Sequence, residues 1–275
     1  MELYLDEFKV NDPANGVYLG DPVEGLAGLP GIRTSSGSNI GRDGGWTSKQ
    51  CYDARFISFP VWIYGRSIAD VEAKRREFAS VLHKRRLTLR IVTLGGHEYV
   101  TNVVVLDAPA PITRIMNRID YKINLRADDP ILYDNTDGDI AAIIRKTVDG
   151  GFDIPFDIPL DISGGSLPTQ IVNAGNETVK PIITIKTRGT NPQLINRTTD
   201  KMIKIEIQTN DGDELRIDMF NGIVMYNGLD IYGLRSAGSE FWGLVPGDNI
   251  VELVTDVLSE KTEAEVRYRS GSIGI

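Results

Sequence analysis

Apolar and polar residues alternate along much of this chain, which is the pattern of β-strands that bury one face. Residues 54–64 are rich in aromatic and β-branched side chains, and residues 119–127 alternate strictly between apolar and polar ones. Two more runs, residues 87–94 and 98–105, flank a turn with two glycines and predict a hairpin. The first half of the chain is therefore expected to be mostly antiparallel strands.

One segment, residues 67–84, has the helical period instead. Ser67 is a suitable N-cap residue, and Asp70 follows three positions later in an approximate capping box. The apolar residues of the segment fall on one helical face: Ile68, Val71, Phe78, Val81 and Leu82. We expect a single amphipathic helix among the strands.

The second half of the chain consists of short alternating runs separated by Gly, Asn and Asp turns. The clearest runs are residues 203–207, 215–217 and 251–253, and no helical period of useful length occurs. This pattern of short strands and turns favours an antiparallel β-sandwich or jelly roll. We therefore predict a mainly β, two-domain fold.

Between the two halves, residues 149–165 contain a repeated four-residue unit, Phe-Asp-Ile-Pro in its clearest form. Its prolines exclude a helix and a central strand, so we expect an extended connector over residues 138–165. Net charge changes across the same region: residues 1–130 carry 17 Lys or Arg against 16 Asp or Glu, and the rest carries 13 against 22. The asymmetry favours two domains, residues 1–137 and 138–275.

The composition is that of a soluble globular protein, with 41% hydrophobic and 25% charged residues among 275. No apolar run is long enough for a membrane helix, and Met1–Glu7 lacks the features of a secretory signal, so we expect no membrane insertion. Cys51 is the only cysteine, which excludes an intrachain disulfide and a multi-cysteine metal site. We expect synthesis in a reducing cytoplasm.

Residues suited to catalysis are sparse. His83 and His97 are the only histidines; His83 lies beside Lys84 in a basic stretch, His97 follows a Gly-Gly turn, and we expect both at the surface. Cys51 has no local acid–base context. A glycosidase carboxylate pair stays open, although most Asp residues lie in turns or on strand faces. The glycine-rich residues 37–45 lack the Lys-Ser/Thr ending of a phosphate loop, and residues 134–139 lack calcium-loop spacing. We expect no enzyme activity, no cofactor and no metal.

The densest positive patch comprises residues 74–76 and 83–86 with Arg90. One interpretation is a solvated helix face paired with Glu72 and Glu77; the other is a subunit contact or a channel lining. Nucleic-acid binding is disfavoured, because few aromatic residues are interleaved with the cations and no domain is strongly basic.

Four aromatic residues of the second half suggest either a sugar platform or ordinary core packing. They are Phe241, Trp242, Tyr226 and Tyr232. Trp242 and Tyr226 are the candidate glycan contacts.

The Gly- and Ser-rich residues 28–45 contain Arg33, Arg42 and Asp43 and precede Tyr-Asp-Ala-Arg at 52–55. By composition this segment is a solvated connector or a contact loop. Its order, Gly-Leu-Pro-x-Ile-Arg-Thr-Ser-Ser-Gly-x-Asn-x-Gly-Arg-Asp-Gly-Gly, resembles the signature of the distal tail proteins of siphoviruses, the bacteriophages with long non-contractile tails.

The resemblance covers almost the whole chain in the family's order. Residues 68–90 resemble the arginine-rich helix and the following strand, and residues 152–162 resemble the connector. Phe-Trp-x-Leu-x-Pro-Gly-x-Asn at 241–249 is the most specific match in the second half.

This resemblance implies an N-terminal β-sandwich or split-barrel domain with one helix and a galectin-like C-terminal β-sandwich. It implies a virion protein whose first domain forms a homo-hexameric ring at the tail tip. The ring would join the tail-tube protein to the tail-tip hub or tail-associated lysin, near the receptor-binding and tape-measure proteins. Since a ring uses a heterologous interface, the candidate subunit contacts are Arg33, Arg42, Asp43, Arg75 and Arg76.

Two other classes stay open at this point. The second domain could be a carbohydrate-binding module for host-surface adhesion, or the chain could be a cell-wall hydrolase.

Overall fold

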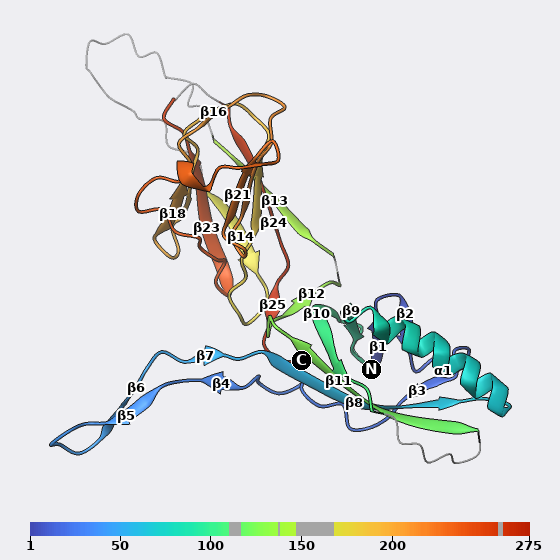
Figure 1. Cartoon of the computed structure of the whole chain (residues 1–275). Coiled ribbons are helices and arrows are strands. Elements are labelled where there is room, and N and C mark those ends of the chain that lie inside the picture. The colour runs from blue at the N-terminus through green and yellow to red at the C-terminus, as the bar shows by residue number, and fades with distance from the viewer. Residues whose placement is uncertain (110–116, 137, 147–167, 258–260) are drawn as a thin grey trace, which may run out of the picture. The chain divides into compact units, whose positions relative to one another are not determined.

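The structure is a computed structural model. It describes residues 1–109, 117–136, 138–146, 168–257 and 261–275. The chain divides into two compact units (Figure 1): unit 1 is Met1–Thr136 with Ser272–Ile275, and unit 2 is Asp137–Gly271.

Unit 1 is built on one antiparallel sheet that curls into a nearly closed barrel. In spatial order its main strands are β2 (Phe8–Val10), β1 (Glu2–Leu5), β9 (Arg86–Val92), β10 (Glu98–Asp107), β11 (Arg118–Ala127), β8 (Arg55–Tyr64) and β3 (Val17–Leu19). The end strands β2 and β3 lie in contact. A further strand, β12 (Leu132–Asp134), pairs with β10 and with β25 (Gly271–Ser272) near the end of the chain.

Alternation along β8 shows how the sequence fills this barrel. Ile57, Phe59 and Ile63 are fully buried, while Phe56 and Tyr64 on the other face are exposed. The inward residues join one core with those of β1, β9 and β11. The expected strands of the first half are thus present, and each buries one face as the period of two requires.

In the described part of unit 1 the one helix is α1 (Ile68–His83), which packs on this core through Phe78. The ring of Phe78 lies 5.7 Å from that of Phe8 and 5.9 Å from that of Tyr121. Ser67 is the N-cap, and its hydroxyl accepts a hydrogen bond from the amide of Asp70, as predicted. Ile68, expected on the apolar face, is exposed.

Unit 2 contains two larger antiparallel sheets. One has the order β13 (Ile140–Arg145), β24 (Glu263–Tyr268), β15 (Ile182–Ile185), β20 (Leu215–Asp218), β21 (Ile223–Tyr226) and β22 (Leu229–Asp230). The other has the order β14 (Thr169–Asn173), β23 (Gly247–Val254), β17 (Gln193–Asn196) and β18 (Lys201–Lys204). Smaller elements are the pair β16 (Gly189–Thr190) and β19 (Gln208–Thr209), and the 3-10 turn η1 (Tyr232–Leu234). Fully buried apolar side chains come from both larger sheets, as in a sandwich.

The mainly β prediction is confirmed, whereas the galectin-like assignment of unit 2 stays a prediction. The expected boundary lies near Asp137, but Ser272–Ile275, assigned by sequence to the second domain, pack with unit 1. Residues 147–165 of the expected connector lie outside the described residues. Separate folding of the two halves stays a prediction. No helix in the described part of the chain has the length and apolar character to cross a membrane.

Candidate functional site: a projecting arm and its anchored base

Residues 29–53, here called the arm, leave the sheet of unit 1 as a narrow antiparallel hairpin (Figure 1). β4 (Ile32–Arg33) pairs with β7 (Cys51–Tyr52), and further out β5 (Ser36–Ser38) pairs with β6 (Gly45–Thr47). Every residue from 31 to 51 is exposed except the half-buried Gly37 and Asn39. The segment that composition suggested to be a loop is therefore a paired hairpin. Its residues are mostly exposed, because little of the rest of the chain covers them.

Glycines in the arm serve its backbone geometry. Trp46 lies opposite Gly37, and a Cβ at position 37 would sit 2.9 Å from the indole Nε1. At the tip, Gly41 and Gly44 have φ angles of 77° and 96°, in the left-handed region that favours glycine. The Gly-rich composition thus reflects a thin hairpin with a tight tip.

The arm exposes apolar side chains that its own chain does not bury. Ile40 at the tip is fully exposed, and Ile32 and Trp46 are 50% and 53% exposed. Arg33 Nε lies 3.6 Å from Asp53 Oδ1 across the base of the arm. This combination of apolar and charged groups on a thin projection is typical of a contact surface.

A buried arginine, Arg55, anchors the base of the arm. Its side chain is 1% exposed and has no carboxylate partner among the described residues. Its three nitrogens donate instead to backbone carbonyls: Nε to Pro130 (2.8 Å), Nη1 to Gly25 (2.6 Å), Leu26 (3.5 Å) and Gly28 (3.1 Å), and Nη2 to Ile273 (2.5 Å). Burial lowers the pKa of Arg55. The side chain stays charged, because a guanidinium loses its proton only far above neutral pH. The residue belongs to the Tyr-Asp-Ala-Arg motif, whose anchoring role sequence reasoning missed.

The cationic candidates lie on α1, at the opposite end of unit 1 from the arm tip (Figure 1). Arg75 and Arg76 are exposed and form no ion pair among the described residues. The ion pairs found here join Lys74 to Asp70 and Lys84 to Asp6, rather than involving Glu72 or Glu77 as the solvated-face interpretation expected. The structure therefore does not bring together the arm candidates and the helix candidates.

An aromatic stripe on the outward face of β8 was not singled out from the sequence. Phe56 and Tyr64 are 58% and 54% exposed, and Trp62 between them is half-buried. The guanidinium of Arg118 on β11 lies 4.6 Å from the Trp62 ring centre, a cation–π contact. The signal was present as aromatic residues at alternate positions of 54–64, on the face opposite to the core.

Trp242 occupies the core of unit 2, with 1% of its surface exposed. A buried indole offers no face to a sugar, so its candidate role as a glycan contact does not fit this structure. The Phe-Trp motif is structural, because three fully buried asparagines hold the loop after it. Asn196 donates to Gly243 O, Asn173 to Leu244 O and Asn249 to Val245 O.

The other aromatic candidates are engaged with neighbours. The hydroxyl of Tyr226 donates to Asp213, and this contact is the first cause that lowers the pKa of Asp213 to about 2. Tyr232 stacks on Phe241 with a centroid distance of 6.2 Å, and Arg235 lies over both rings. These aromatics do not form a single platform with Trp242.

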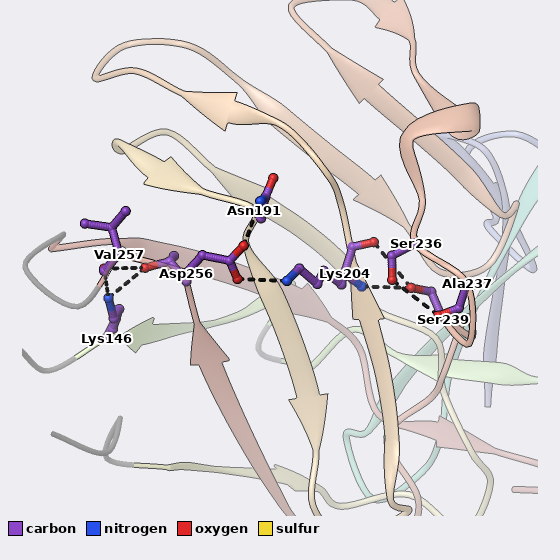
Figure 2. A network of polar contacts seen from close by, with 9 residues as sticks. Lys146, Asn191, Lys204, Ser236, Ala237, Ser239, Asp256 and Val257 are labelled. Carbon is purple, nitrogen blue, oxygen red and sulfur yellow. Dashed lines mark hydrogen bonds and ion pairs between the residues drawn. The ribbon is translucent and has the colours of Figure 1, made fainter. Parts of the chain in front are cut away.

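Polar contacts also join strands in unit 2 (Figure 2). Asp256 accepts hydrogen bonds from Lys204 Nζ (2.8 Å) and Asn191 Nδ2 (2.7 Å), and Lys204 lowers the pKa of this carboxyl. The nearby Lys146 is 6% exposed and donates to Thr255 Oγ1 at 2.7 Å. The polar groups of Asp256, Lys204 and Lys146 thus bond to other residues of unit 2. Across the described residues, no cluster of three His, Cys, Asp or Glu is placed to hold a metal ion.

Comparison with known proteins finds a family model that matches part of unit 2 and a similar fold over the whole chain. Residues 174–271 match the model of the siphovirus-type tail component, C-terminal domain. The crystal structure of SPP1 Dit, described as a paradigm of the hub adsorption apparatus in phages that infect Gram-positive bacteria, is similar over 98% of both chains, with 14% identity and a TM-score of 0.68.

Two structures of the phage P2 baseplate in its activated conformation, with Ca and with Sr, cover 92% of this chain and 90% of theirs. Their identities are 11% and 12%, and the TM-score is 0.48 for each. No curated protein matches the sequence. The resemblance to siphovirus distal tail proteins is confirmed by the family match and the shared fold.

Substitutions at Trp242 separate a core role from a ligand role. Trp242→Ala is expected to destabilise unit 2 by ~3–5 kcal/mol through the cavity it leaves. Trp242→Phe is expected to cost less than about 1.5 kcal/mol, because it keeps most of the ring and removes a buried Nε1 that has no hydrogen-bond partner. Denaturant unfolding followed by circular dichroism measures both, and an unchanged midpoint for Trp242→Ala would contradict the core assignment.

Deleting Ser272–Ile275 is expected to loosen the base of the arm, because it removes Ser272 of β25 and one acceptor of Arg55. Leaving a charged donor short of an acceptor costs ~1–3 kcal/mol or more. Hydrogen exchange of the full-length and shortened chains should show faster exchange at residues 25–28. Ile273→Ala, which keeps the carbonyl, is the control and should change exchange there much less; equal effects would rule out the carbonyl contact as the cause.

Tyr226→Phe is expected to raise the pKa of Asp213 from about 2 towards its ordinary value of 3.8, since it removes the first cause of the depression. The folded-state pKa is below the unfolded one, so this contribution to stability is complete above about pH 4. In the unsubstituted protein this contribution to stability is lost as pH falls through about 2. In Tyr226→Phe the loss occurs at a higher pH, because the folded-state pKa of Asp213 is higher. Carboxylate NMR titration measures the shift, with Tyr232→Phe as a control that should leave Asp213 unchanged.

Proposed function

We propose that this siphovirus-type tail component is a non-catalytic adaptor whose unit 1 forms a six-fold ring at the tail tip. In this proposal the ring joins the tail tube to the hub or tail-associated lysin and the receptor-binding apparatus. The observation that carries it is the arm, which exposes Ile32, Ile40 and Trp46 without covering them in its own chain. Such side chains are stabilised when a partner removes them from water.

A ring of identical subunits needs two different surfaces on each copy. The arm supplies one, and we infer that the aromatic stripe of β8 supplies the other. Its residues Phe56, Trp62 and Tyr64 offer apolar area. The neighbouring strand β11 adds the charged residues Arg118 and Asp120, whose side chains form an ion pair at 2.6 Å. An arm with both charge signs fits a face that also carries both.

Charge distribution supports contacts between copies of unit 1. Counted over the whole sequence, unit 1 holds 17 Lys or Arg and 17 Asp or Glu, whereas unit 2 holds 13 against 21. Six copies of unit 1 therefore meet without net repulsion, while six copies of unit 2, each at −8, repel one another when close. Unit 1 is thus the better candidate for the ring, including the separate proposal that Arg75 and Arg76 form subunit contacts.

The ring is tested with Ile32→Ser/Ile40→Ser in the full chain. The unsubstituted protein at high concentration, or beside its tail-tube and hub partners, is expected to give hexamers of about 182 kDa, six chains of 30.4 kDa each. The double variant should remain monomeric, because the apolar contacts of the arm are lost. Native mass spectrometry and negative-stain imaging read the outcome.

Leu229→Ser is the matched control, since Leu229 is 70% exposed but belongs to unit 2. It should leave the ring intact. A monomer in all conditions would refute the ring. Hexamers of the double variant would move the interface away from the arm.

A further inference from the structure

An open groove of about 380 Å³ lies on the outward face of β20 and β21 in unit 2. It is lined by Glu214, Arg216, Asp218, Ile223, Met225 and Gly228. The antiparallel register places Arg216 opposite Met225 and Asp218 opposite Ile223. The intervening residues of both strands point into the core, so the groove belongs to the solvent face of the sheet.

The two carboxylates of the groove are already engaged. Glu214 Oε2 lies 3.3 Å from Lys186 Nζ. Asp218, only 9% exposed, accepts from the amides of Phe220 (3.0 Å) and Asn221 (2.9 Å) and from the Asn221 side chain (2.8 Å). Glu214 is therefore ion-paired and Asp218 hydrogen-bonded within unit 2, although the charge of Asp218 has no cationic partner among these contacts.

Arg216 differs, because its guanidinium forms no hydrogen bond or ion pair with any described residue. This lack of a partner occurs in a unit with a net charge of −8, where acidic groups are plentiful. A guanidinium presents a planar fork that binds a carboxylate or a phosphate through two parallel hydrogen bonds. The groove thus combines one available cation with apolar walls formed by Ile223 and Met225.

We propose that this groove binds one unit of an anionic saccharide. The acidic group of the sugar pairs with Arg216, its C–H face contacts Ile223 and Met225, and its hydroxyls donate to the remaining lone pairs of Glu214. Along the chain a carboxylate flanks Arg216 on each side, two residues or roughly 7 Å away. A sugar with a single charge among neutral hydroxyls fits this acid–base–acid order, whereas an acidic peptide places further carboxylates against Glu214 and Asp218.

The experiment uses the full chain labelled at the methionine methyl groups. Met225 lines the groove, and the fully buried Met219 is an internal reference. The probes are glucuronate, glucose 6-phosphate, glucose and an acidic tetrapeptide. A saturable shift of the Met225 methyl signal is expected with glucuronate or glucose 6-phosphate, and whichever binds tighter identifies the carboxylate or the phosphate as the anion.

Arg216→Gln should weaken this binding at least about tenfold, as expected for loss of a charge-assisted hydrogen bond. Arg267→Gln is the matched control, because Arg267 lies on the same sheet but pairs with Glu265 at 2.8 Å. The proposal is overturned if neither anionic sugar gives a saturable shift, if Arg216→Gln binds as tightly as the unsubstituted protein, or if glucose or the peptide binds as well. Sugar binding by this groove does not require ring formation, so a negative result here would leave the proposed adaptor function untouched, and the converse also holds.

Discussion

The fold of unit 1 depends on one buried cation. Arg55 carries a positive charge into the base of the barrel without a carboxylate to balance it among the described residues. Burial of an unpaired charge is very unfavourable unless hydrogen bonds replace its hydration. The carbonyls around Arg55 do this, and they come from segments that are distant in sequence: residues 25–28, Pro130 and Ile273.

This single contact links three features that look unrelated in the sequence. The carbonyls of residues 25–28 immediately precede the arm, so the arm leaves a fixed point of the barrel rather than a loose loop. Ile273 belongs to the segment that returns to unit 1 after unit 2, and β25 pairs there with β12. Unit 2 is therefore an insertion in unit 1 whose entry and exit strands are hydrogen-bonded neighbours. Arg55 thus ties the segment before the arm and the C-terminal segment to the same point of unit 1.

Local pattern predicted the regular elements of this protein well. The helix at 67–84 and the strands at 54–64 and 119–127 follow from periodicity and from an N-cap at Ser67, because burial of one face decides them. The position of residues 272–275 could not be predicted, since it depends on the carbonyl that Ile273 offers to a distant arginine. The arm was missed for a related reason: glycine and serine predict a loop, and only the opposing Trp46 shows that Gly37 lies in a strand.

The candidate sites show the same difference between local and distant information. From the sequence Trp242 is either a sugar contact or a core residue. The structure places it in the core, and the buried asparagines that hold the loop after it come from three different strands. Arg216 attracts no attention in sequence, because it is one cation among many in an acidic half. Its distinction is the absence of a partner among the described residues, which follows from Glu214 and Asp218 being satisfied elsewhere. Unit 1 offers apolar area on a neutral surface, suited to copies of itself. Unit 2 carries a net charge of −8, which disfavours close contact between its copies, and Arg216 is the cation of the proposed anion site.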